Sequence, residues 1–363
     1  MVLTTAAEFE LEDWKRSLIT LALNGLHEMY DKESGLFCFR AVRGKPGLVR
    51  EGASVRYTLI ALLGLQAARD KDMHTRPDFA DCAARLMNRI GREEIGETGL
   101  LLWLCAKACP DRLGDVCKRL HPETIWRTCQ ASGEFRTMEM SWFLTGLAYA
   151  SRLGGRVLLP GLMDAVFEKI RGNYGKGVFG HQQGGNLGSR LRGPVGTFAD
   201  QVYPIYAFAQ YGKEAANAEA VGIAAECART ICAHQGRLGQ WWWHYDMRTG
   251  RVISRYPVFS VHQDAMAPMA LQAAGKASGE DFRKEIDRGL AWVTGENELD
   301  QEMIDNRLNL VWRCIYMRRH RQMLDTAFSL AGLIRAGGVN PSALRVRMEC
   351  RPYHLGWILY AFQ

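Results

Sequence analysis

The sequence lacks a long apolar run, a paired cysteine motif and a low-complexity linker. No stretch reaches the roughly 18 uncharged apolar residues of a membrane span, and the first residues carry no secretory signal pattern. The ten cysteines include no CxxC pair, so we expect reduced, buried thiols in a cytoplasmic protein without a metal site. Because no Pro-, Ser- or Gly-rich tract divides the 363 residues, we expect one domain over 1–363.

The sequence also lacks a basic stripe and a phosphate-binding loop. Its net charge of +7 is dispersed, apart from a cluster around His320 that we interpret as a solvated helix face and that comprises Arg313, Arg318, Arg319 and Arg321. The glycine-rich stretch 180–190 has no GxxxxGK[ST] pattern. These absences argue against nucleic acid and against a nucleotide cofactor. They favour a small anionic molecule or saccharide as the partner, with a homodimer as an open possibility.

Amphipathic stretches recur along the whole chain, whereas alternating strand patterns are almost absent. Alternate stretches are apolar all round, as in the segment 57–65, and a helix of that kind must be surrounded by protein. The stretches between them have one apolar face, which predicts an outer ring around an inner ring. We therefore expect an all-α (α/α)6 toroid of helical hairpins. The stretches are 9–30, 54–69, 77–90, 97–109, 112–129, 137–151, 160–171, 198–211, 214–234, 262–275, 280–294, 306–336 and 353–362.

The inner helices are expected to begin near 54, 97, 137, 198, 262 and 353. A Gly-x-aromatic turn precedes four of them, and the aromatic residues of these turns are Phe37, Phe135, Phe179 and Trp241. In a toroid of helical hairpins, the loops that lead into the inner helices gather at one rim of the central cavity. We therefore expect the substrate site at that rim.

The richest candidate site is the segment 241–246, followed by an inner-helix start at 262–264. Three successive tryptophans cannot all face a core, so at least one should offer a flat apolar face to a groove. Asp264 is a candidate acid or base near a helix N-terminus, although an N-cap role is the alternative. The candidate residues of this site are Trp241, Trp242, Trp243, His244, Tyr245, His262, Gln263 and Asp264.

A second inner-helix start carries the same acid and amide in reversed order, at Asp200 and Gln201, followed by Tyr203. Two carboxylates facing one cavity, one protonated and one ionised, are what glycoside hydrolysis requires. We therefore predict Asp200 and Asp264 as a catalytic pair, with His244 and His262 beside them. A capping role for Asp200 is the structural alternative.

Other polar residues stand at predicted inner-helix starts, where a charge inside an apolar ring is costly unless it is paired or solvated. Each is a candidate for binding substrate, and two arginines could hold an anionic group in bidentate fashion. His181 lies in a glycine-rich segment, 172–197, that we expect to form a mobile flap over the cavity. The other candidates are Arg56, Tyr57, Glu139, Trp142, Arg351, Tyr353 and His354.

The unit from Gly239 through the tryptophans to the helix start at 262–271 resembles the repeat of (α/α)6 carbohydrate-active enzymes. It is most similar to the unsaturated glucuronyl hydrolases, and the N-acylglucosamine 2-epimerases and toroidal polysaccharide lyases share the layout. The resemblance implies acid/base chemistry on an acidic or amino sugar, by hydrolysis, epimerisation or elimination. A terpene-cyclase-like or lanthionine-cyclase-like toroid is an alternative, although their acid and zinc motifs are absent. A non-catalytic binding toroid is the third reading.

Overall fold

The computed structural model describes residues 6–45, 47–91, 94–153, 161–317 and 340–362. Most of the basic cluster around His320 lies outside these ranges. Within them, none of the helices is both long and apolar enough to cross a bilayer.

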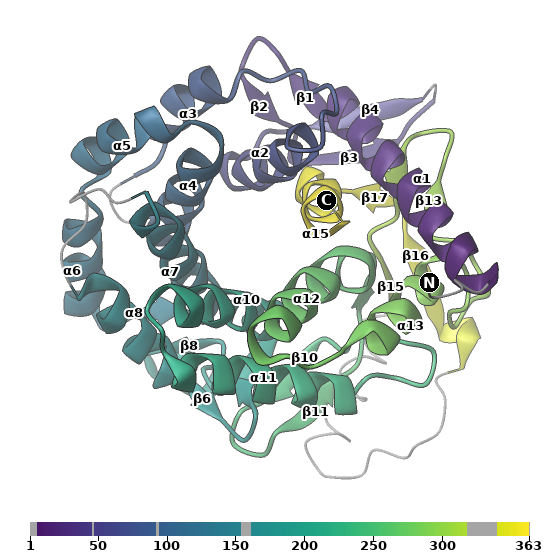
Figure 1. Ribbon diagram of the computed structural model, residues 1–363. Helices are drawn as coiled ribbons and strands as arrows, with labels where there is room; N and C mark the ends of the chain where they lie inside the picture. Colours follow the sequence, from purple (N-terminus) through teal and green to yellow (C-terminus); the bar gives the residue numbers. More distant parts are fainter. Residues whose placement is uncertain (1–5, 46, 92–93, 154–160, 318–339, 363) are drawn as a thin grey trace.

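Helices that are apolar all round form a closed inner ring, in which each helix packs on the next and α15 packs on both α12 and α2 (Figure 1). This arrangement confirms the predicted (α/α)6 toroid and the six predicted inner-helix starts. The inner helices are α2 (Val55–Arg69), α4 (Ile95–Ala108), α7 (Thr137–Ser151), α10 (Ala199–Glu214), α12 (Ala267–Ser278), which extends the short π-helical turn η2 (His262–Met266), and α15 (Pro352–Phe362).

The outer helices cover this ring with one apolar face each. In α5, for example, the buried residues are Leu113, Val116, Cys117 and Leu120, at the spacing of one helix face. Two-faced helices therefore complete the core without being enclosed themselves. The outer helices are α1 (Ala6–Met29), α3 (Phe79–Met87), α5 (Leu113–Leu120), α6 (Pro122–Ser132), α8 (Leu162–Arg171), α11 (Ala218–Ala233) and α13 (Arg283–Val293).

Glycines allow neighbouring inner helices to approach closely. A Cβ atom added at Gly146 of α7 would lie 2.2 Å from the carbonyl oxygen of Gly99 in α4. At Gly64 of α2 it would lie 2.1 Å from the carbonyl oxygen of Gly356 in α15. Both distances are far below van der Waals contact, so these positions hold glycine for packing reasons.

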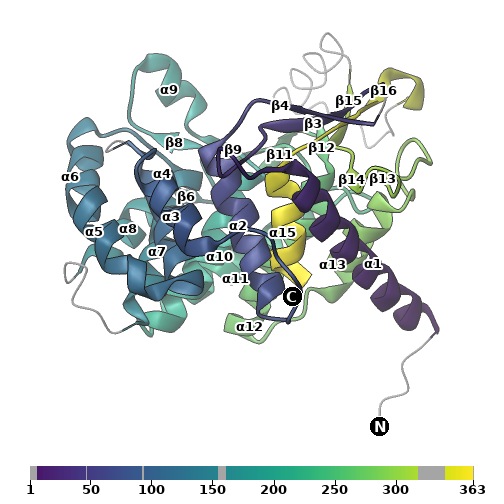
Figure 2. The same cartoon turned by 90° about the horizontal axis from the view of Figure 1, so that it is seen from above.

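Short strands gather at one end of the toroid, and the C-terminal ends of α12 and α15 lie at the other (Figure 2). The short strands form small antiparallel sheets such as β9–β10–β11 and β12–β15–β16. The helix predicted over 306–336 is wrong for 306–317, because 306–309 form a turn, β14 pairs with β13, and β15 pairs with both β12 and β16. Residues 318–336 of this prediction lie outside the described ranges. The strands of these two sheets are β9 (Val195–Thr197), β10 (His244–Asp246), β11 (Arg251–Ser254), β12 (Val258–Phe259), β15 (Cys314–Met317) and β16 (Leu344–Arg347), and β13 (Ile304–Asp305) and β14 (Leu310–Val311) form another pair.

Candidate active site

A cavity of about 180 Å³ opens among the N-terminal parts of the inner helices. Its lining combines aromatic rings with two guanidinium groups and one imidazole. Seven predicted site residues contribute to it: Arg56, Tyr57, Trp142, Tyr203, Trp243, His262 and Tyr353. Sequence reasoning did not assign Phe259, Met266 or Arg313 to a site, and these also line the cavity.

Arg56 joins two carboxylates from neighbouring inner helices. Its Nε donates to Oε1 of Glu97 at 2.7 Å, and its Nη2 donates to Oε1 of Glu139 at 2.9 Å. The guanidinium also lies over the ring of Trp142, 5.2 Å from its centroid. The side chains of Glu97 and Glu139 are 9% and 17% exposed. Sequence reasoning missed Glu97, although a lone carboxylate in the apolar run 95–105 was a usable signal.

A second charged group surrounds Glu349. Arg313 and Arg351 each approach Oε1 of Glu349, at 3.2 Å and 3.0 Å. Burial alone would raise the pKa of Glu349, but the two arginines outweigh burial and lower it. Arg351 also lies over the ring of Phe39 and donates to the Phe39 carbonyl oxygen at 3.2 Å. Arg313 lines the cavity and Arg351 does not, so only Arg313 is placed to meet a ligand there.

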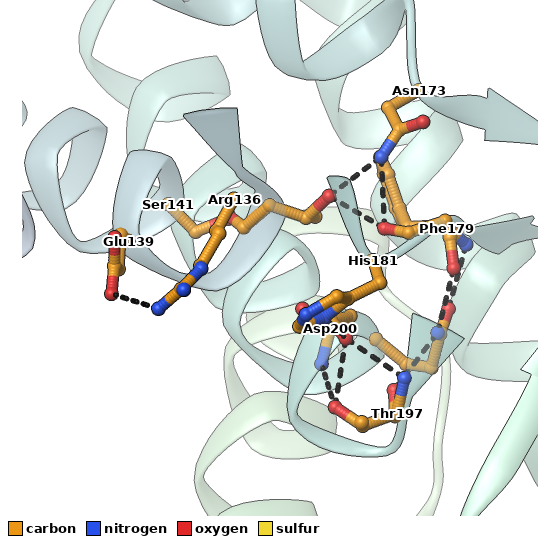
Figure 3. Close-up of polar contacts among 11 residues, drawn as sticks. Arg136, Glu139, Ser141, Asn173, Phe179, His181, Thr197 and Asp200 are labelled. Carbon is orange, nitrogen blue, oxygen red and sulfur yellow. Dashed lines mark hydrogen bonds and ion pairs between the residues drawn. The ribbon is translucent and has the colours of Figure 1, made fainter. Parts of the chain in front are cut away.

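Asp200 is buried at the start of α10, where it caps the turn (Figure 3). Its Oδ2 accepts from the Thr197 backbone N–H and hydroxyl, both at 2.8 Å, and lies 2.9 Å from Nδ1 of His181. The other oxygen, Oδ1, is buried and has no hydrogen-bond partner within the ranges that the structure describes. Asp200 therefore both caps the turn through Thr197 and contacts the imidazole of His181.

Asp264 is fully enclosed in η2. Its Oδ1 lies 2.7 Å from Nε2 of His354, and its Oδ2 has no hydrogen-bond partner among the described residues. Burial raises the pKa of Asp264, and the nearby His354 offsets only part of this effect. Neither Asp264 nor Asp200 is among the residues that line the cavity.

The two predicted histidines differ in position. His262 lies parallel to Trp243, with ring centroids 6.0 Å apart, and 4.6 Å from the Phe198 ring. Burial lowers the pKa of His262 well below its usual value. His244 lies on β10, outside the cavity lining, and burial lowers its pKa to about 3. Both imidazoles are therefore neutral at physiological pH.

The tryptophan run divides among three environments. Trp241 is fully buried, Trp242 lies against Tyr256 with ring centroids 6.3 Å apart, and Trp243 lines the cavity. Tyr245 is fully buried, and no residue in the described part of the chain forms a hydrogen bond with its hydroxyl. Trp243 is thus the member of the run that offers a face to the cavity.

Inner-helix side chains hold the preceding Gly-x-aromatic turns. The N–H of Phe179 donates to Oε1 of Gln201 at 2.7 Å, and the N–H of Trp241 donates to Oε1 of Gln263 at 3.3 Å. In the first turn, Thr58 takes the same place, because its hydroxyl accepts from the N–H of Phe37 at 2.9 Å. Gln201 and Gln263 are buried and do not line the cavity, so their contacts explain why amides stand at these positions.

The segment 172–197 folds into short strands and α9 (Leu187–Arg192). Its backbone is tied down by bonds from Gly180 to Asn173 and from His181 to Gly193. Part of it borders a second pocket, of about 420 Å³, whose lining includes Glu139, Gln182 and Ser189. The mobility that we predict for this segment stays a prediction.

The described ranges contain no group of three or more His, Cys, Asp or Glu side chains arranged to hold a metal ion.

No protein-family model and no curated protein matches this chain. Solved structures do match over nearly the whole length. A heparin-specific unsaturated glucuronyl hydrolase has 12% sequence identity and a TM-score of 0.57, and the match covers 97% of this chain and 96% of that chain. The enzyme from Bacillus sp. GL1 has 16% identity and a TM-score of 0.57, with 95% and 94% covered. A Streptococcus agalactiae variant bound to dGlcA-GalNAc6S has 10% identity and a TM-score of 0.63, with 100% and 92% covered. The chain therefore has the (α/α)6-toroid fold of the unsaturated glucuronyl hydrolases.

Proposed function

We propose that this chain is a carbohydrate-active enzyme that hydrolyses a glycosidic bond in an acidic saccharide. The saccharide would bind at the cavity of about 180 Å³ that Arg56 lines. The observation that carries the proposal is the arginine-linked carboxylate pair, Glu97 and Glu139, beside the aromatic lining. The fold supports it, since the structures that it resembles are named as glucuronyl hydrolases. This function is an inference from the site, because a shared fold alone does not fix an activity.

The lining favours a sugar that carries a negative charge. Trp142 and Trp243 offer indole surfaces of the kind on which the apolar faces of sugar rings stack. The Arg313 guanidinium borders the same space and can donate to a carboxylate or sulfate group. A volume of about 180 Å³ lies below the roughly 300–1,000 Å³ of small-molecule sites, so the cavity has room for one sugar residue at most and the rest of the saccharide must extend outward.

Glu139 is the carboxylate best placed for proton transfer. Neither glutamate lines the cavity itself, but Glu139 is more exposed than Glu97 and borders the second pocket, through which water and substrate can reach it. Glu139 is paired with Arg56 and Arg136, so it must leave these guanidinium groups before it can carry a proton. We assign Glu139 to protonate the substrate in that released state and Glu97 to remain ionised against Arg56. Hydrolysis then adds water across the cleaved bond, the proton going to one fragment and the hydroxyl group to the other.

The predicted pair Asp200 and Asp264 takes a different place in this proposal. Each contacts a histidine, and neither lines the cavity. We propose that Asp200 positions His181, which is 20% exposed, and that Asp264 positions His354. A carboxylate that orients an imidazole in this way fixes its tautomer and its direction.

Turnover of unsaturated and saturated acidic disaccharides by the purified protein tests the proposal. We expect Glu139→Gln to lower kcat by about 10²–10⁴-fold, because it removes the proton donor. Arg313→Met should raise KM with a smaller effect on kcat. Arg255→Met is the matched control, since Arg255 lies beside Trp242 and does not line the cavity. Absence of turnover on every acidic disaccharide, or full activity of Glu139→Gln, would refute the assignment.

Sugar epimerisation is a second candidate, favoured by the contact between His181 and Asp200. An imidazole that a carboxylate orients can, in its neutral form, remove a proton from one face of a carbon, and a second acid must then deliver a proton to the opposite face. The two reactions differ in product mass, because only hydrolysis adds water. The cyclase reading would use buried aromatic residues of the inner helices to line a chamber, but Trp103 and Trp357 are fully buried and do not line this cavity.

A further inference from the structure

A larger cavity, of about 780 Å³, lies at the opposite end of the toroid. Its lining comes from the C-terminal parts of inner helices, including α12 and α15, which end away from the short strands (Figure 2). The volume falls within the roughly 300–1,000 Å³ of small-molecule sites. Nothing in the proposed hydrolysis uses this space.

Three tyrosine hydroxyl groups converge at this cavity. The hydroxyl oxygens of Tyr149 and Tyr206 are 2.8 Å apart, those of Tyr206 and Tyr360 are 2.7 Å apart, and those of Tyr149 and Tyr360 are 3.3 Å apart. All three residues belong to the lining. Burial raises the pKa of Tyr206 and Tyr360 well above the usual value, so these phenols stay protonated. When the ring of hydroxyls opens, each can donate to a bound acceptor.

Four lysines border the same space: Lys71, Lys107, Lys213 and Lys276. Within the described part of the chain, no carboxylate lies within ion-pair distance of any of them. Only one carboxylate, Asp70, is among the lining residues, and it accepts from Nε2 of Gln66 at 2.7 Å. The lining therefore carries more lysine ammonium groups than carboxylates, and its net charge is positive.

We infer that this cavity binds a polyanionic small molecule whose phosphate or sulfate groups are closely spaced. Among the lining residues, the phenols supply neutral donors and the lysines supply point charges, a combination that suits tetrahedral oxyanions. Lysines in the last turn of a helix also offset the partial charge of its C-terminal carbonyls. That role alone requires neither the cavity nor the converging hydroxyls.

Calorimetric titration of the whole chain with inorganic tripolyphosphate tests the inference, and a multiply sulfated disaccharide provides the sulfate arm. We expect the triple variant Lys107→Gln, Lys213→Gln and Lys276→Gln to weaken tripolyphosphate binding by about tenfold or more. The control triple changes exposed lysines elsewhere and lowers the net charge equally. It comprises Lys32→Gln, Lys118→Gln and Lys284→Gln, and we expect it to weaken binding by less than about twofold.

Two further variants locate the site. Tyr149→Phe removes one converging hydroxyl while keeping the ring, and we expect about threefold to tenfold weaker binding. Arg313→Met, in the other cavity, should leave tripolyphosphate binding unchanged even if it abolishes turnover. No binding of either probe to the unmodified chain, equal weakening by the two lysine triples, or loss of binding in Arg313→Met would overturn the inference. A loss of stability in the cavity triple without a loss of affinity would assign the lysines to the helix ends alone.

Discussion

Replacing Arg56 by methionine tests the electrostatics of the carboxylate pair. Methionine keeps most of the contact with Trp142 but leaves Glu97, whose side chain is 9% exposed, without its positive partner. Breaking a fully enclosed ion pair costs about 3–5 kcal/mol. Because the Arg56 side chain is 29% exposed, we expect a smaller loss, about 2–3 kcal/mol in the free energy of unfolding.

Urea denaturation of four proteins measures this loss: the unmodified chain, Arg56→Met, Glu97→Gln and the double variant. The double variant should recover at least half of the loss, because a neutral amide needs no counter-charge. Arg136→Met is the matched control. Its contact with Glu139 is 3.5 Å long and Arg136 is 58% exposed, so we expect a loss below about 0.5 kcal/mol.

A double variant as unstable as Arg56→Met, or a loss in Arg136→Met as large as that in Arg56→Met, would refute the reasoning.

Three other predictions address other parts of the molecule. Burial depresses the pKa of His244 to about 3, so the contribution of neutral His244 to stability is complete above about pH 6.5 and is lost as pH falls. Between about pH 3 and pH 6.5, the unfolding free energy of His244→Phe, measured by denaturation at several pH values, should therefore rise with pH less steeply than that of the unmodified chain, by up to about 1 kcal/mol per pH unit. Gly146→Ala should cost about 3 kcal/mol or more in urea, whereas Gly222→Ala on α11, with no heavy atom within 4 Å of the added Cβ, should be neutral or stabilising. Trp243→Ala should weaken saccharide binding about tenfold by calorimetry, and equal weakening by Trp242→Ala, which changes a ring outside the lining, would contradict this.

The inner ring was predictable because a helix that is apolar all round leaves one physical solution, enclosure by other helices. The extended part of 306–317 was not, because Leu310, Val311 and Ile315 suit a buried helix as well as a strand. Their conformation follows instead from pairing with strands before and after them in the sequence. Short apolar segments of this kind take their structure from long-range partners.

The candidate site shows the same division. Aromatic and charged residues at helix starts were predicted to gather at one rim, and seven of them line one cavity there; that this cavity binds substrate stays a proposal. One of the two partners of Arg56 did not emerge, because Glu97 lies 41 positions away and the ion pair exists only after α2 and α4 pack together. Gln201 and Gln263 were selected as site residues because a polar group at a helix start can either bind substrate or hold a neighbouring loop. The hydrogen bonds by which both amides hold the backbone of the preceding turn are visible only in the structure.

The ring is completed by α15, which packs against α2 from near the opposite end of the chain. It contributes Tyr353 to one cavity and Tyr360 to the other. A chain emerging from the ribosome therefore cannot form either cavity fully until residues 352–362 have been synthesised. Until then, the apolar sides of α2 and α12 lack this neighbour and are open to chaperones or to misassociation. Closure of the ring by α15 therefore completes both cavities in the same folding step.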